Sequence, residues 1–146
     1  MTSYTDKIKQ SAKRLLKEGQ VETVIGFRRG SVPMMHQPMF AKSEGEVENF
    51  VFDSNCGINL ANYVIDAGEK IGVVAKGCDS RNLAVHIVEG KINRDQLYII
   101  GVPCTAMIDR HKITAMMPGE IESITEDEAG GTVTVSGNGF SETLSK

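Results

Sequence analysis

The chain begins with the apolar spacing of an amphipathic helix. In residues 2–20, apolar side chains recur near one helical face while Lys and Arg occupy the other. Gly19 follows at a position where helices are commonly capped. The apolar stretch 21–27 then predicts a strand, and residues 34–42 predict an edge strand or a loop because they contain Pro38. The first part of the chain is therefore expected to contribute a surface helix and a short strand.

The middle of the chain has the pattern of a strand-helix-strand unit. Residues 70–76 and 97–104 are nearly continuous apolar strands, and a helix is expected between them at residues 80–89. Such a unit is typical of parallel strands in a sheet that is covered on both faces. Apolar positions at helical spacing also predict a helix from about residue 56 to residue 67.

The pattern changes near the C-terminus, where short alternating segments are separated by Gly-Gly and Gly-Asn-Gly turns. These segments predict an antiparallel β meander, and residues 107–117 predict a helical turn or two before it. A chain of 146 residues favours one domain. We therefore expect an α/β fold: a mostly parallel sheet with helices on both faces over residues 1–118, and a β-meander appendage over residues 119–146 that packs on or extends this core.

Charge and composition argue against several classes of function. Sixteen basic and nineteen acidic residues give a net charge of -3 without a large basic cluster, so nucleic acid is not an expected partner. The sequence contains neither a signal peptide nor a long apolar run, so a cytoplasmic chain without membrane insertion is expected. The absence of a GxGxxG motif and of a Walker loop argues against a standard NAD or ATP site.

The three cysteines fall at comparable junctions of the predicted elements. Cys78 and Cys104 follow the two apolar strands, so a single crossover should place them at one edge of the sheet. Cys56 is expected to open the preceding helix at that same edge. Ligands bind at this edge in open parallel sheets, and a helix N-terminus favours a thiolate. We expect metal or redox chemistry there, and burial as a small apolar side chain is the alternative.

Two basic turns are candidates for binding an anion at the same edge. Arg81 lies beside a glycine and an Asp or Ser cap at a helix start, which could hold a pyrophosphate. Arg28 and Arg29 flank a turn at Gly30, although a solvated turn explains this pair slightly better.

A closed zinc or cluster site takes four ligands, so three thiols leave one position to be filled. The histidines are His36, His86 and His111, of which His86 lies among apolar helix positions and is expected to be structural. His111 follows Cys104 and is a candidate for the fourth position. No CxxC motif occurs.

Four segments, in order, resemble the beta-subunit family of the deazaflavin-coenzyme hydrogenases and dehydrogenases, which are flavin and iron-sulfur proteins of anaerobes. The segments are VIGFRRGSVPMMHQPMF, FDSNCGINLANYVID, VVAKGCDSRNL and YIIGVPCTAMID, within a resemblance that covers residues 21–144. The resemblance implies a cytoplasmic electron-transfer subunit that binds FAD and a four-iron (4Fe-4S) cluster. Members of the family are longer, so this chain resembles their front part.

The resemblance also implies roles for individual residues. The cluster-ligand or redox positions would be Cys56, Cys78 and Cys104. The flavin side of the same edge would be lined by Lys76, Gly77, Asp79, Ser80, Arg81 and Asn82. Because only three thiols are present, another chain is expected to complete the cluster.

The expected function is therefore that of an oxidoreductase component rather than a complete enzyme. Its partners would be other subunits of a hydrogenase- or dehydrogenase-type complex, and homo-oligomers are an additional option. The alternatives are a non-catalytic subunit-docking module of the same complex and a thiol-redox or zinc-binding protein. We expect the partner, or a second copy, to dock on an apolar surface around Val133, Val135 and Phe140.

Overall fold

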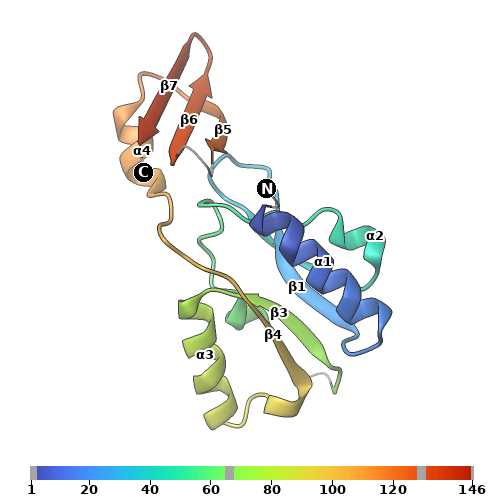
Figure 1. Cartoon of the computed structure of the whole chain (residues 1–146). Helices are drawn as coiled ribbons and strands as arrows, with labels where there is room; N and C mark the ends of the chain where they lie inside the picture. Colours follow the sequence, from blue (N-terminus) through green and yellow to red (C-terminus); the bar gives the residue numbers. More distant parts are fainter. Residues whose placement is uncertain (1–2, 65–67, 128–130, 146) are drawn as a thin grey trace.

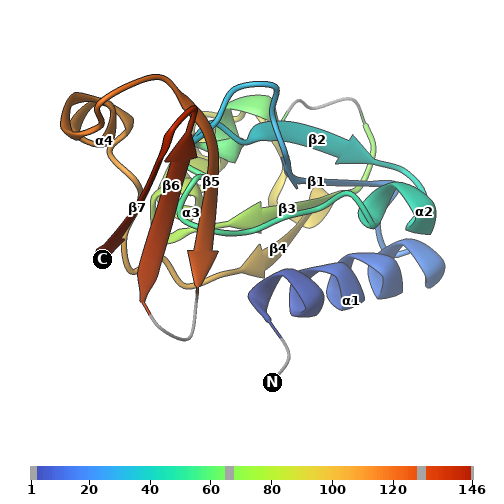
Figure 2. The ribbon, with the colours of Figure 1, turned by 90° about the horizontal axis from the view of Figure 1, so that it is seen from above.

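The computed structural model describes residues 3–64, 68–127 and 131–145. It contains a four-stranded sheet of order β2-β1-β3-β4 and a separate three-stranded sheet of order β5-β6-β7. The first sheet lies between helices, while the second stands beside one end of it (Figures 1 and 2). This arrangement confirms the predicted α/β fold with a C-terminal antiparallel meander.

The predicted helices and strands occur in the expected order, except for one helix described below, and the short α2 and η2 are additional to the prediction. The first half contains α1 (Tyr4–Lys17), β1 (Thr23–Arg28), β2 (Gln37–Ala41), α2 (Glu44–Val47) and the 3-10 turn η1 (Leu60–Tyr63). The second half contains β3 (Ile71–Ala75), α3 (Gly77–Val88), the 3-10 turn η2 (Arg94–Gln96), β4 (Leu97–Gly101), α4 (Arg110–Met116), β5 (Ile121–Asp127), β6 (Thr132–Gly137) and β7 (Phe140–Ser145).

The first sheet has a parallel centre and one antiparallel edge. Strand β3 pairs in parallel with β1 on one side and with β4 on the other, which confirms the strand-helix-strand unit. Strand β2 pairs antiparallel with β1 and forms an edge of the sheet. Pro38 lies within β2, in accord with the prediction of an edge strand, because proline cannot donate a ladder hydrogen bond.

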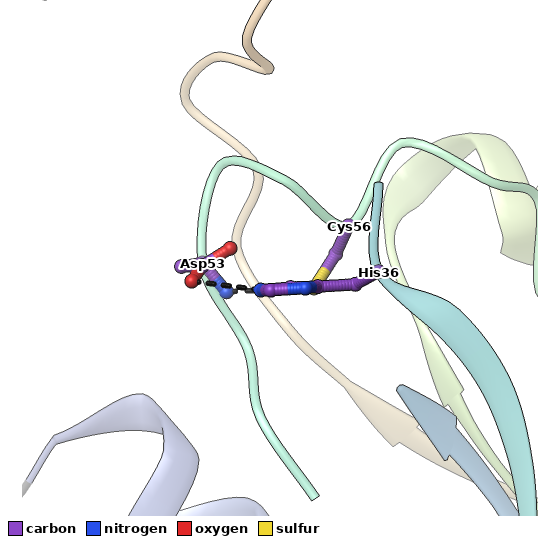
Figure 3. A group of neighbouring side chains, drawn as sticks. All are labelled: His36, Asp53 and Cys56. Carbon is purple, nitrogen blue, oxygen red and sulfur yellow. Dashed lines mark hydrogen bonds and ion pairs between the residues drawn. The ribbon is translucent and has the colours of Figure 1, made fainter. Parts of the chain in front are cut away.

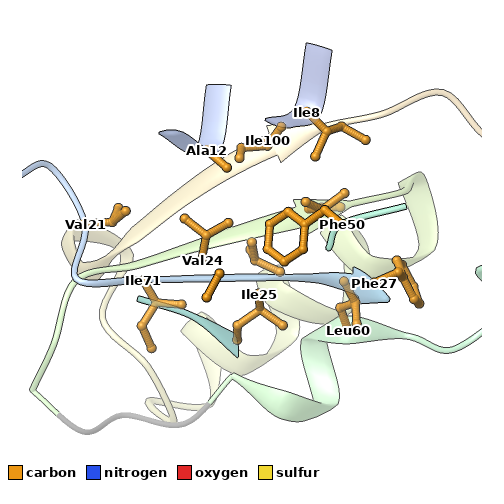
Figure 4. Close-up of a cluster of buried hydrophobic side chains, with 14 of the residues drawn as sticks. Ile8, Ala12, Val21, Val24, Ile25, Phe27, Phe50, Leu60, Ile71 and Ile100 are labelled. Carbon is orange, nitrogen blue, oxygen red and sulfur yellow. The ribbon is translucent and has the colours of Figure 1, made fainter. Parts of the chain in front are cut away.

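The core of the protein lies on both faces of this sheet. Helix α1 covers one face and contributes Ile8 and Ala12, whereas α3 and η1 lie on the opposite face (Figures 1 and 4). On β1, Val24 points toward the α1 side and Ile25 toward the η1 side (Figure 4), as strand alternation requires. Gly26 allows close packing here, because a Cβ at this position would come within 2.9 Å of the Phe50 ring.

The predicted helix over residues 56–67 is wrong. Cys56 lies in a turn, helical structure in this region is restricted to η1, and residues 65–67 lie outside the described part of the chain. The reason is a competing tertiary bond: the Leu60 N–H donates to the Asp79 carboxylate at 2.7 Å instead of to a carbonyl of its own turn. The Asn59 side chain also accepts from the Ala61 N–H, which stabilises a local turn.

Two further expectations need correction. Helix α3 begins at Gly77 rather than near residue 80, because the Asp79 carboxylate accepts the Lys76 N–H at 2.7 Å and caps an earlier start. The proposed docking surface on the meander is also wrong at two of its three residues, because Val133 and Val135 are 4% and 0% exposed, whereas Phe140 is half-buried. Buried side chains cannot present an apolar surface to a partner.

In the described part of the chain, none of the helices combines the length and apolar character that a membrane span requires.

A buried ion pair joins β3, α3 and the segment before η1. Lys76 and Asp79 are 2% and 0% exposed, and the Lys76 ammonium lies 3.0 Å from the Asp79 carboxylate. The same ammonium donates to the Ile58 carbonyl at 3.0 Å and lies 4.7 Å from the centroid of the Phe27 ring. These contacts compensate two charges that would otherwise be costly to remove from water.

We expect the substitution Asp79→Ala to lower the free energy of unfolding by about 3–5 kcal/mol, because it leaves the Lys76 charge buried without its counter-ion. Urea unfolding followed by circular dichroism measures this change. The matched control is Glu89→Ala, which removes the carboxylate of the exposed Lys91–Glu89 pair and should leave the midpoint nearly unchanged. Equal effects of the two substitutions would contradict the structural role of the buried pair.

Candidate functional site

Two exposed thiols lie at the carboxyl-end edge of the parallel strands. Cys78 lies in the first turn of α3, directly after β3, and Cys104 lies shortly after β4. Because β3 and β4 are parallel neighbours with Ala75 paired to Gly101, both cysteines follow the same edge of the sheet. Both are exposed. The prediction that these two thiols share an edge is confirmed.

Cys56 has a different environment from the other two thiols. It is fully buried, its Sγ accepts the Asp53 N–H at 3.5 Å, and its thiol donates to the Val51 carbonyl at 3.8 Å. Burial raises the pKa of the Cys56 thiol to about 12. The expectation that Cys56 opens a helix whose N-terminus favours a thiolate is therefore wrong.

Cys56 belongs to a group with His36 and Asp53 (Figure 3). His36 Nε2 and Asp53 Oδ2 are 3.0 Å apart, and the ligand atoms of all three residues lie within 4.8 Å of one another. Burial raises the pKa of Asp53, but hydrogen bonds with His36 and Asn55 outweigh it and hold this pKa below its ordinary value. Among the described residues, this is the one set of three such side chains that is close enough for a single metal ion.

Two cavities flank the turn formed by residues 53–56. The larger, of about 250 Å³, is lined by Asp53 and Ser54 on one side and by the Cys104 segment on the other. Ser54 donates its N–H and its hydroxyl to the Glu126 carboxylate of β5 at 2.7 and 2.8 Å, which ties the meander to this wall. The smaller cavity, of about 110 Å³, is lined by His36 and Asn55.

The residues expected at the flavin side divide into a buried and an accessible set. Lys76 and Asp79 are buried and use their polar atoms in the ion pair and in backbone contacts. The accessible set around the start of α3 consists of the exposed Gly77 and Arg81 and the half-buried Ser80 and Asn82.

The basic turn after β1 lies at the same edge, because β1 and β3 are parallel neighbours. Arg28 and Arg29 are exposed. Gly30 is required by the turn itself, since a Cβ there would lie 2.1 Å from the Met35 carbonyl oxygen. Met34 has a φ of 63°, an unfavourable left-handed conformation for a side chain of this size. This tight turn leads directly into His36.

Sequence reasoning missed Asp53 as a member of the group and counted His36 only as a spare histidine. The sequence DSNC does carry a local signal, because the side chain of an aspartate that begins a turn often accepts the backbone N–H two residues later. In the structure, the Asp53 carboxylate accepts the Asn55 N–H at 2.8 Å. His36 joins this turn through a bond from its N–H to the Asn55 carbonyl at 3.3 Å. His111, the expected substitute ligand, is exposed on α4.

Comparison with known proteins gives a fold relationship only. No family model and no curated protein matches the chain. Among solved structures, it is similar to a chain of the F420-reducing NiFe hydrogenase complex from Methanosarcina barkeri, with a TM-score of 0.57 and 16% identity. The match covers 98% of this chain and 58% of that chain. The chain thus shares its fold with part of a chain found in a multi-subunit redox complex.

The two thiol environments predict a difference in reactivity. With metal-free folded protein at neutral pH, we expect Cys78 and Cys104 to react quickly with an aromatic disulfide reagent, because both are exposed. Cys56 should react only after denaturation, because its pKa of about 12 and its burial keep it protonated and inaccessible. Mass spectrometry of the labelled peptides identifies each site. Rapid labelling of Cys56 in the folded protein would contradict this assignment.

Proposed function

We propose that the chain is an electron-transfer module of a multi-subunit oxidoreductase, and that it works at the carboxyl-end edge of its parallel strands. The observation that carries the proposal is the placement of Cys78 and Cys104, which are exposed at the ends of adjacent parallel strands. The fold similarity to a chain of a hydrogenase complex supports an assignment to redox complexes in general.

The cofactor in this proposal is an iron-sulfur cluster shared with another chain. A four-iron cluster normally takes four cysteine thiolates. Cys78 and Cys104 would be the ligands from this chain, because both are exposed and follow adjacent parallel strands. Cys56, which the family resemblance also implies, is buried and bonded to its own turn. The remaining ligands would therefore come from the partner.

FAD is the second cofactor of the proposal. The edge offers exposed guanidinium groups on Arg81, Arg28 and Arg29, which suit the charge and the geometry of a pyrophosphate. The exposed residue Gly77 lies at the start of α3, where backbone N–H groups have no intrahelical partner. These groups would bind and orient the FAD, and the cofactors themselves would carry out the electron transfer.

The cluster proposal predicts incomplete iron binding by the chain alone. Reconstitution with iron and sulfide under nitrogen should give a substoichiometric, labile chromophore, because the isolated chain lacks a full ligand set. Either Cys78→Ser or Cys104→Ser should abolish the visible absorption, while His111→Asn, the matched control at an exposed side chain, should retain it. A stable stoichiometric cluster in the monomer would show that the chain contains all four ligands. Absorption that persists in both cysteine variants would reject this edge.

The flavin proposal predicts a charge-dependent affinity for FAD. Replacing Arg81 or Arg29 by alanine should weaken FAD binding about tenfold, because a hydrogen bond to a charged group contributes at least about 1.5 kcal/mol. The control is Arg94→Ala, because Arg94 precedes β4 and therefore lies at the opposite edge of the sheet. Fluorescence titration measures the affinities. If the alanine variants of both Arg81 and Arg29 bind FAD as tightly as the original chain, FAD does not bind at this edge.

A further inference from the structure

We propose that His36, Asp53 and Cys56 form a zinc site, separate from the two exposed thiols. The three residues supply an imidazole, a carboxylate and a thiol, which are the three side-chain types that zinc takes in proteins. They come from the residue before β2 and from the turn 53–56, so the ion would link two segments that are distant in sequence. This inference goes beyond the proposed function and does not depend on it.

The distances suit one ion of this size. Zinc binds nitrogen and oxygen at about 2.0–2.2 Å and sulfur at about 2.3 Å, so tetrahedral ligand atoms lie roughly 3–4 Å from one another. His36 Nε2 and Asp53 Oδ2 are already 3.0 Å apart, and the largest separation within the group is no more than 4.8 Å. Figure 3 shows the Asp53 carboxylate at the tip of the His36 ring and the Cys56 side chain directed at the same ring.

Asn55 provides a second and independent observation. It is 6% exposed, and among the described residues its side-chain oxygen has no hydrogen-bond partner. An unpartnered buried oxygen is unfavourable unless a further group satisfies it. Asn55 lines the cavity of about 110 Å³ that His36 also lines, which has room for a water molecule. A water in the fourth zinc position could donate to this oxygen.

The surroundings already orient the ligands. The Asn55 side-chain N–H donates to Asp53 Oδ1 at 3.0 Å, leaving Oδ2 for His36 or for an ion. The Asp53 N–H points to Cys56 Sγ at 3.5 Å and would stabilise a thiolate. Such outer contacts fix ligand orientation in metal sites.

The donor set also decides which ion binds. A thiolate with an imidazole favours zinc and similar transition metals over Mg²⁺ and Ca²⁺, which prefer oxygen ligands. On binding, zinc replaces the Cys56 thiol proton, which is released to solvent, and no electron is transferred. Because the three side chains are already close together, the main effect of a bound ion would be to hold the turn 53–56 against the segment that enters β2.

The test titrates metal-free full-length chain with Zn²⁺ against a chromophoric chelator, and with Co²⁺ as a visible probe. We expect one Zn²⁺ per chain, and a thiolate-to-cobalt charge-transfer band. His36→Gln and Cys56→Ser should each weaken zinc binding by about 100-fold or more, because loss of a ligand exceeds the roughly 10–100-fold effect of an outer contact. Asn55→Leu should weaken it about tenfold. The matched control is the double variant Cys78→Ser/Cys104→Ser, which should bind zinc as the original chain does.

The inference is overturned if His36→Gln binds zinc as tightly as the original chain, or if the double cysteine variant loses the ion. A cobalt complex without the charge-transfer band also overturns it. Should Cys56→Ser fail to fold, His36→Gln still decides, because the His36 side chain is 11% exposed whereas Cys56 is fully buried. The proposed cluster depends on Cys78 and Cys104 instead, so failure of one proposal leaves the other intact.

Discussion

The ion pair between Lys76 and Asp79 is the contact on which the candidate sites depend. Its two charges are almost completely removed from water, which is tolerated because the carboxylate receives two backbone N–H groups and the ammonium reaches a carbonyl and an aromatic ring. The pair sets where α3 begins and therefore where Cys78 lies. Through its hydrogen bonds with the Ile58 carbonyl and the Leu60 N–H, the pair also fixes the segment that follows Cys56. One buried interaction thus positions both the exposed thiol edge and the buried group.

The parts of the fold that were predictable are those with a regular apolar period. Strand β3, helix α3 and strand β4 repeat their pattern over enough residues for topology to follow, and topology alone placed Cys78 and Cys104 together. The helix expected from residue 56 failed because Leu60 bonds to a distant carboxylate that no local pattern reveals. The group of His36, Asp53 and Cys56 was not predictable for the same kind of reason, since it combines a turn with the entry to an antiparallel edge strand.

The chain shows how three copies of one residue type acquire different chemistry from their surroundings. Cys78 and Cys104 face solvent at strand ends, whereas Cys56 is enclosed and bonded to its own backbone. Accessibility suits the first two to exchange electrons or ligands with another molecule. Enclosure suits the third to a permanent role within the fold. The similarity to a chain of a hydrogenase complex concerns the fold, so these environments carry the functional argument.

The contact between Ser54 and Glu126 has a mechanical consequence for the larger cavity. One carboxylate accepts both the N–H and the hydroxyl of a single serine, which fixes the direction of approach as well as the distance. The meander therefore cannot swing about this contact without breaking one of the two bonds. Ser54 and Glu126 both line the cavity beside Cys104, so these two hydrogen bonds hold one part of the cavity wall in place.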